Sequence, residues 1–73
     1  PYLDIAEQLQ VDDDQIFRAA VYNLTNIAVN EERYAAEIIK ALEETAFQCN
    51  RSGEQLDYVK SKINVIKNKL RNT

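Results

Sequence analysis

Turn-forming residues are almost absent from this chain. Its 73 residues include one proline, at the first position, and one glycine, Gly53. A small β-domain needs turn residues every few positions, so this scarcity argues against a β fold. The residues that dominate, such as alanine, leucine, isoleucine, glutamate and lysine, favour helices, and the apolar ones recur at helical spacing. The sequence therefore predicts an all-α fold.

The length and composition indicate one small domain. Hydrophobic residues make up 45% of the chain and charged residues 29%, which is a globular balance. A domain of this size buries only about 60% of the surface of its unfolded chain, so we expect marginal stability. Residues 1–73 are expected to form a single helical domain. Because the sequence begins at Pro1 and contains no methionine, we expect a processed chain or part of a longer one.

The last helix has the clearest signals. Ser52 and Gln55 have the spacing of a capping box, and the acidic start and basic end of the segment 53–71 suit the helix dipole. Apolar residues then recur at intervals of three and four, which is the pattern of a coiled-coil seam. The seam residues are Leu56, Val59, Ile63, Ile66 and Leu70.

Three further helices are predicted before it. A helix over 31–50 has a wide apolar stripe that includes Phe47 and Cys49. A helix over 13–29 has one buried face, and a short helix is expected over 2–9. Three helices of similar length with short joins predict a small antiparallel three-helix bundle with a short N-terminal helix.

A second topology remains open. The apolar seam keeps its register backwards from the last helix to residue 35, which is also the pattern of one long helix over 31–71 with Gly53 tolerated inside it. The chain would then be a long helical hairpin, and two hairpins could dimerise into a four-helix bundle.

The aspartate run Asp12–Asp14 is interpreted as a helix start. Asp12 or Asp13 can cap the helix that follows, as Asn30 can cap the helix over 31–50. A calcium loop would need alternating oxygen ligands, a glycine for its turn and a later glutamate, and none of these follows.

The composition argues against an enzyme. With no histidine and a single cysteine, Cys49, most metal sites and most pairs of nucleophile and base are excluded. We predict no catalytic, cofactor-binding or metal-binding residues. No apolar run is long enough to span a bilayer and no signal-peptide core is present, so a cytoplasmic protein without a membrane partner is expected.

Residues 5–24 give the alternative function, a small helix-turn-helix DNA-binding domain. Ile5, Ala6, Leu9, Val11 and Ile16 are spaced as in many helix-turn-helix units. The would-be recognition helix opens with three aspartates, however, and these would repel phosphates. The net charge of −3 is also too acidic for a general nucleic-acid binder, so a nucleic-acid partner is disfavoured.

The leading hypothesis is a helical module for protein–protein interaction or oligomerisation. Charge is unevenly distributed, with a net −6 in residues 1–37 and a net +3 in residues 38–73. Opposite charges can set the orientation of two chains, while the apolar seam supplies burial. The seam residues are also predicted to bind a partner, together with Tyr58 and Val65, a second stripe on the last helix that Tyr22 or Tyr34 could extend. The expected partner is a second copy, as a homodimer, or another helical protein.

Overall fold

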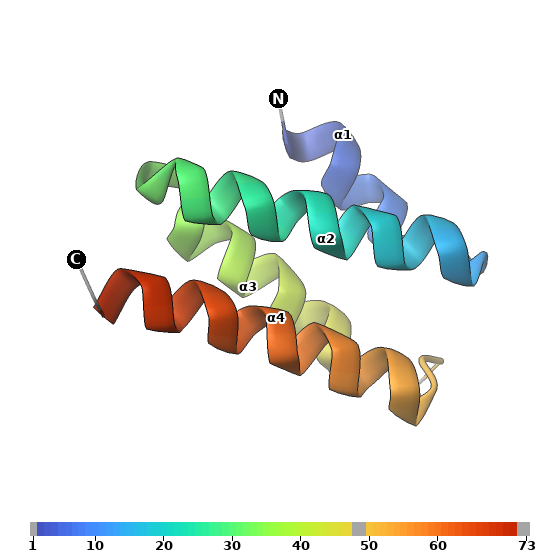
Figure 1. The fold of residues 1–73 in the computed structure, drawn as a ribbon. Helices are drawn as coiled ribbons and strands as arrows, with labels where there is room; N and C mark the ends of the chain where they lie inside the picture. The colour runs from blue at the N-terminus through green and yellow to red at the C-terminus, as the bar shows by residue number, and fades with distance from the viewer. Residues whose placement is uncertain (1, 48–49, 72–73) are drawn as a thin grey trace.

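The computed structural model describes residues 2–47 and 50–71, and these residues are helical with no strand. The prediction of an all-α fold is confirmed. Within the described residues, four α-helices and two short 3₁₀ turns follow one another (Figure 1). They are α1 (Tyr2–Glu7), η1 (Gln8–Gln10), α2 (Asp14–Asn30), η2 (Glu32–Tyr34), α3 (Ala35–Ala46) and α4 (Gly53–Arg71).

The side-chain caps that the sequence predicts at the starts of α2 and α4 are present. The backbone N–H of Gln55 donates to the hydroxyl of Ser52, and the N–H of Ser52 donates to the side-chain oxygen of Gln55, each over 3.2 Å. This reciprocal pair is the predicted capping box of α4. At the start of α2, the carboxylate of Asp13 accepts from the N–H of Ile16 over 3.0 Å, so Asp13 rather than Asp12 is the cap.

The predicted bounds of α3 are wrong at both ends. Asn30 does not cap α3, because it is the last residue of α2, and the N–H of Glu31 closes α2 on the carbonyl of Ile27 over 2.8 Å. The chain then passes through η2 before α3 begins at Ala35. At the other end α3 stops at Ala46 instead of residue 50.

The alternative of one continuous helix over 31–71 is therefore wrong. The N–H of Phe47 bonds to the carbonyl of Glu44, three residues back, in the tightened last turn that ends α3. A separate cap at Ser52 starts α4. The predictions for Cys49 fall outside the described residues.

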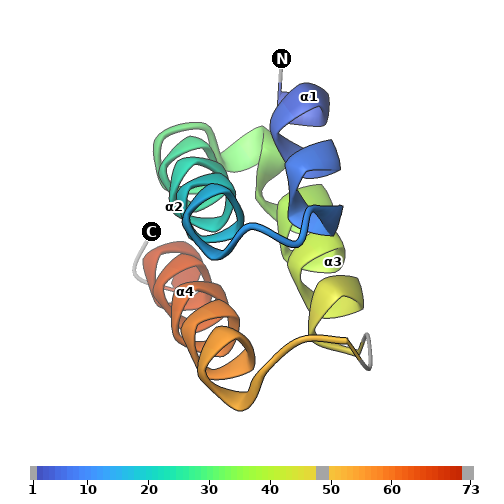
Figure 2. The same ribbon diagram turned by 90° about the vertical axis from the view of Figure 1, so that its right-hand side faces the viewer.

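The three longer helices lie side by side. α2 and α4 run in the same direction, and α3 runs against both (Figure 1). The side-chain amide of Gln55 donates to Asp14 over 2.9 Å and joins the N-terminal ends of α2 and α4. Viewed along the helices, α2 and α4 form one side of the molecule and α1 and α3 form the other (Figure 2).

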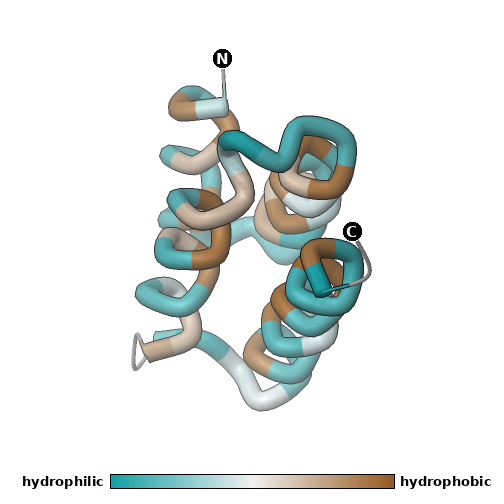
Figure 3. Tube along the Cα trace, turned by 90° about the vertical axis from the view of Figure 1, so that its left-hand side faces the viewer, coloured by the Kyte–Doolittle hydropathy of each residue, from teal (hydrophilic) through white to brown (hydrophobic). Residues whose placement is uncertain are grey.

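The core lies between these two sides, and apolar positions of α3 turn toward α2 and α4 (Figure 3). Phe17 and Leu24 of α2 and Ile38 and Leu42 of α3 are fully buried there. The buried core residues in the described part of the chain are Leu9, Phe17, Ala20, Val21, Leu24, Ala28, Ala35, Ile38, Leu42, Val59, Ile63 and Ile66.

α1 is held to the rest of the molecule by Tyr2. The Tyr2 hydroxyl donates to the carboxylate of Glu37 on α3, and the Tyr2 ring lies 5.3 Å from the ring of Tyr34, centre to centre. The hydrogen bond to Glu37, followed by desolvation, raises the pKa of Tyr2 above its ordinary value. Tyr34 therefore packs against α1, on the side of the molecule away from Tyr58 and Val65.

Candidate interaction surfaces

The apolar seam of α4 is largely buried in the core of the same chain. Val59 and Ile66 are fully buried, and Ile63 is 7% exposed. Leu56 and Leu70 are half-buried, and Leu70 packs against the core. The packing of this helix against α2 and α3 therefore occupies most of the seam that was predicted to bind a partner.

The second stripe of α4 forms a surface with α2. Tyr58 and Tyr22 share one cation, because the ammonium of Lys62 lies 5.3 Å from the ring centre of Tyr58 and 5.7 Å from that of Tyr22. The guanidinium of Arg18 lies 5.3 Å from the centre of the same Tyr58 ring. Tyr22 is 52% exposed and Val65 is 46% exposed. We call these five residues the α2–α4 face, and it is Tyr22 rather than Tyr34 that extends the predicted stripe.

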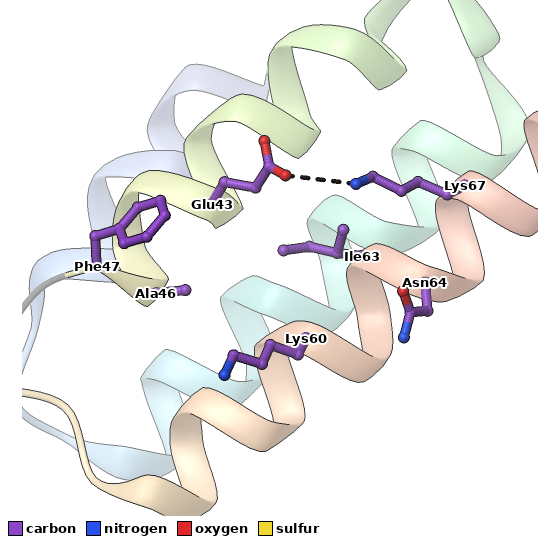
Figure 4. A pocket seen from close by; sticks show the side chains of 7 residues that line it. All are labelled: Glu43, Ala46, Phe47, Lys60, Ile63, Asn64 and Lys67. Carbon is purple, nitrogen blue, oxygen red and sulfur yellow. Dashed lines mark hydrogen bonds and ion pairs between the residues drawn. The ribbon is translucent and has the colours of Figure 1, made fainter.

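A groove of about 510 Å³ opens between the end of α3 and the middle of α4 (Figure 4). Ile63 lies at its floor, and Lys67 and Glu43 form an ion pair across it over 3.5 Å. Phe47 stands at the end of α3 beside the groove and is 85% exposed. Lys60 lines the same groove and forms no ion pair within the part of the chain that the structure describes.

A second hollow, of about 340 Å³, lies between α1 and α3. Its apolar lining includes Leu3, which is 61% exposed. Glu7 and Glu44 lie at the hollow, and neither carboxylate has an ion-pair partner among residues 2–47 and 50–71. The full lining is Leu3, Ala6, Glu7, Leu9, Gln10, Ala41, Glu44 and Thr45.

The aspartate run has a structural role. Asp13 caps α2, and Asp14 accepts from Gln55 and, over 2.9 Å, from the guanidinium of Arg18. The hydrogen bonds from Gln55 and then from Arg18 hold the pKa of Asp14 below its ordinary value of 3.8. No group of three or more potential metal ligands occurs in the described part of the chain.

Sequence reasoning missed Phe47 and Leu3 as surface residues. The sequence places Phe47 on the apolar stripe of a helix that reaches residue 50. In the structure α3 ends at Ala46, and the ring of Phe47, the next residue, is exposed to solvent. Leu3 lies on the short helix that the sequence predicts over 2–9. The helix ends after Glu7, and Leu3 points away from the core.

None of the helices in the described residues is long and apolar enough to cross a membrane.

Comparison of the chain with protein-family models, with curated proteins and with solved structures finds no match in any of the three.

Proposed function

We propose that this chain is a non-enzymatic helical module that acts by protein–protein association, with a second copy of itself as its partner. Its three long helices form an antiparallel bundle, and the short α1 covers one side of it. The surface that associates is the apolar surface that remains after the core has closed.

The observation that carries this proposal is the exposure of large apolar side chains on a domain with a small core. Within the described residues, five remain exposed: Leu3, Ile16, Tyr22, Phe47 and Val65. A single exposed apolar residue is normal, but a phenylalanine that is 85% exposed beside an open groove is typical of an interaction site. Association would also stabilise a domain too small to bury much surface alone.

The alternative function, DNA binding by residues 5–24, has less support. Asp13 and Asp14 lie at the start of α2, where a recognition helix would meet the phosphates. Arg18, the basic residue of that segment, is paired with Asp14 over 2.9 Å. A salt-dependent gel shift with duplex DNA separates the two functions, and we expect no shift at physiological salt.

Thermal unfolding at a series of protein concentrations tests the proposed function. Because association stabilises only the folded form, Tm should rise with protein concentration. Added salt should lower that gain modestly, since exposed ion pairs contribute only about 0–1 kcal/mol each. A Tm that stays constant up to high micromolar protein would contradict self-association.

A further inference from the structure

We propose that two copies of the chain associate by placing Phe47 of each in the α1–α3 hollow of the other. This inference rests on the proposed function, because it specifies the surface through which self-association occurs. It assigns Phe47 as the anchor, the hollow as its receptor and a second copy as the occupant.

Phe47 has the properties of an anchor. It stands at the end of α3, and 85% of its surface is open to solvent. Its neighbour across the α3–α4 groove, Lys60, forms no ion pair with any residue that the structure describes (Figure 4). Exposed aromatic rings are enriched at the centres of interfaces, and a lysine beside such a ring would lie at the polar rim.

The α1–α3 hollow has the complementary properties. Its volume of about 340 Å³ can take a benzyl group, and Leu3, Ala6 and Ala41 give it apolar walls. Glu7 and Glu44 at the hollow form no ion pairs among the described residues. The hollow is large enough for the phenylalanine ring, and its two unpaired carboxylates are opposite in charge to the lysine that lines the groove with Phe47.

The two surfaces lie on opposite flanks of one helix. Glu43, Ala46 and Phe47 of α3 face the groove with α4, while Ala41 and Glu44 face the hollow with α1. A twofold axis parallel to α3, displaced beyond its exposed face, would exchange these flanks and place each Phe47 on the side of the partner's hollow. Such an interface is closed, so the arrangement stops at a dimer.

The alternative surface for a second copy is the α2–α4 face. Its cations already lie over its own rings, since Lys62 contacts both Tyr22 and Tyr58, and Arg18 contacts Tyr58. The cations of the α2–α4 face therefore already have aromatic partners within the chain. Phe47 and the hollow both expose apolar surface, and the charged residues beside them, Lys60, Glu7 and Glu44, form no ion pairs among the described residues.

Sedimentation equilibrium of three variants tests the assignment. Phe47→Ser removes both anchors of the dimer, and Ala41→Phe fills both hollows from within each chain. Each should weaken dimerisation about 100-fold, because two aromatic contacts are lost at about tenfold each. Val65→Ser is the matched control, an exposed apolar residue on the α2–α4 face, and it should leave the dimer constant within about twofold. Circular dichroism melts at low concentration check that each variant folds.

A mixing experiment separates a direct contact from a general effect. A chain with Phe47→Ser keeps its hollow, and a chain with Ala41→Phe keeps its Phe47. An equimolar mixture can therefore restore one of the two contacts, and it should dimerise about tenfold more tightly than either variant alone. Should Ala41→Phe fail to fold, Glu44→Lys on the exposed rim replaces it in the same design, with a smaller loss of its own, and the gain on mixing is then measured against the Phe47→Ser homodimer.

The outcomes distinguish this inference from the proposed function. A wild-type dimer that survives Phe47→Ser, or that is lost with Val65→Ser instead, would overturn the assignment and leave self-association standing. A mixture no tighter than its components would also overturn it. A wild-type chain that stays monomeric would contradict both.

Discussion

The guanidinium of Arg51 lies over the ring of Phe17, 4.2 Å from its centre, and donates a hydrogen bond to the carbonyl of Leu9. Arg51 is 8% exposed, and its Nε has no hydrogen-bond partner among residues 2–47 and 50–71. Arg51 lies in the segment that connects α3 to α4. Its side chain therefore attaches this segment to η1 and to the first turns of α2. This contact positions α4 against the rest of the molecule.

Replacing Arg51 should therefore destabilise the domain as a whole. Arg51→Ala removes the stacking on Phe17 and leaves a buried carbonyl without its donor, at a total cost of about 2 kcal/mol in the free energy of unfolding. Urea denaturation measures this loss. Arg33→Ala is the matched control, since Arg33 lies 4.7 Å from the ring centre of Tyr34 at an exposed position. A loss for Arg51→Ala no larger than that for Arg33→Ala would show that the buried contact does not stabilise the fold.

The α4 seam should tolerate no charge. Ile63→Asp places a carboxylate at a position that is 7% exposed, and the cost of several kcal/mol approaches the total stability expected of so small a domain, about 5 kcal/mol. The variant should lose most of its helical dichroism at 25 °C. Val65→Asp, on the exposed side of the same helix, should keep wild-type helicity. If Ile63→Asp melts like the wild type, α4 is not packed through this seam.

The capping role of Asp13 predicts a difference between neighbouring aspartates. Asp13→Ala removes the acceptor for the N–H of Ile16 and should lower the free energy of unfolding by about 1 kcal/mol. Asp12→Ala removes an exposed carboxylate that caps nothing, and its effect should stay within about 0.5 kcal/mol. Chemical denaturation of the two variants measures both changes, and equal losses would contradict the assignment of the cap.

The lowered pKa of Asp14 predicts how stability changes with acid. A carboxyl whose pKa is lower in the folded chain than in the unfolded chain stabilises the fold above its unfolded value, near 3.8, and that contribution is lost as pH falls through the folded value. The stability of the wild type should therefore exceed that of Asp14→Asn at pH 7, and the gap should narrow below pH 4. A gap that is constant from pH 7 to pH 2 would contradict the pairing with Gln55 and Arg18.

The features that could be predicted from the sequence are those that depend on residues close together along the chain. The capping box of Ser52 and Gln55 and the buried seam of α4 follow from spacing along one helix, and the sequence narrowed the cap of α2 to Asp12 or Asp13, of which Asp13 is the one used. The end of α3 was not predictable in this way, because no glycine or proline marks it and the helix stops where the chain must turn toward α4.

The candidate interaction surfaces were harder to predict from the sequence. The exposure of Phe47 depends on where α3 ends, and the α1–α3 hollow depends on how two separate helices meet. The burial of Arg51 was not predictable from the sequence, since it depends on contacts with residues about forty positions away. Tyr58 and Val65 could be placed on one stripe, but their neighbour Tyr22 comes from another helix.

The mass of the wild-type chain in solution tests the central claim most directly. Sedimentation equilibrium from low to high micromolar concentration should show a weight-average mass that rises from the 8.4 kDa of the monomer toward twice that value. The interface is small, so a dimer constant of about micromolar or weaker is expected. A mass that remains at 8.4 kDa throughout this range would contradict self-association as the function of the chain.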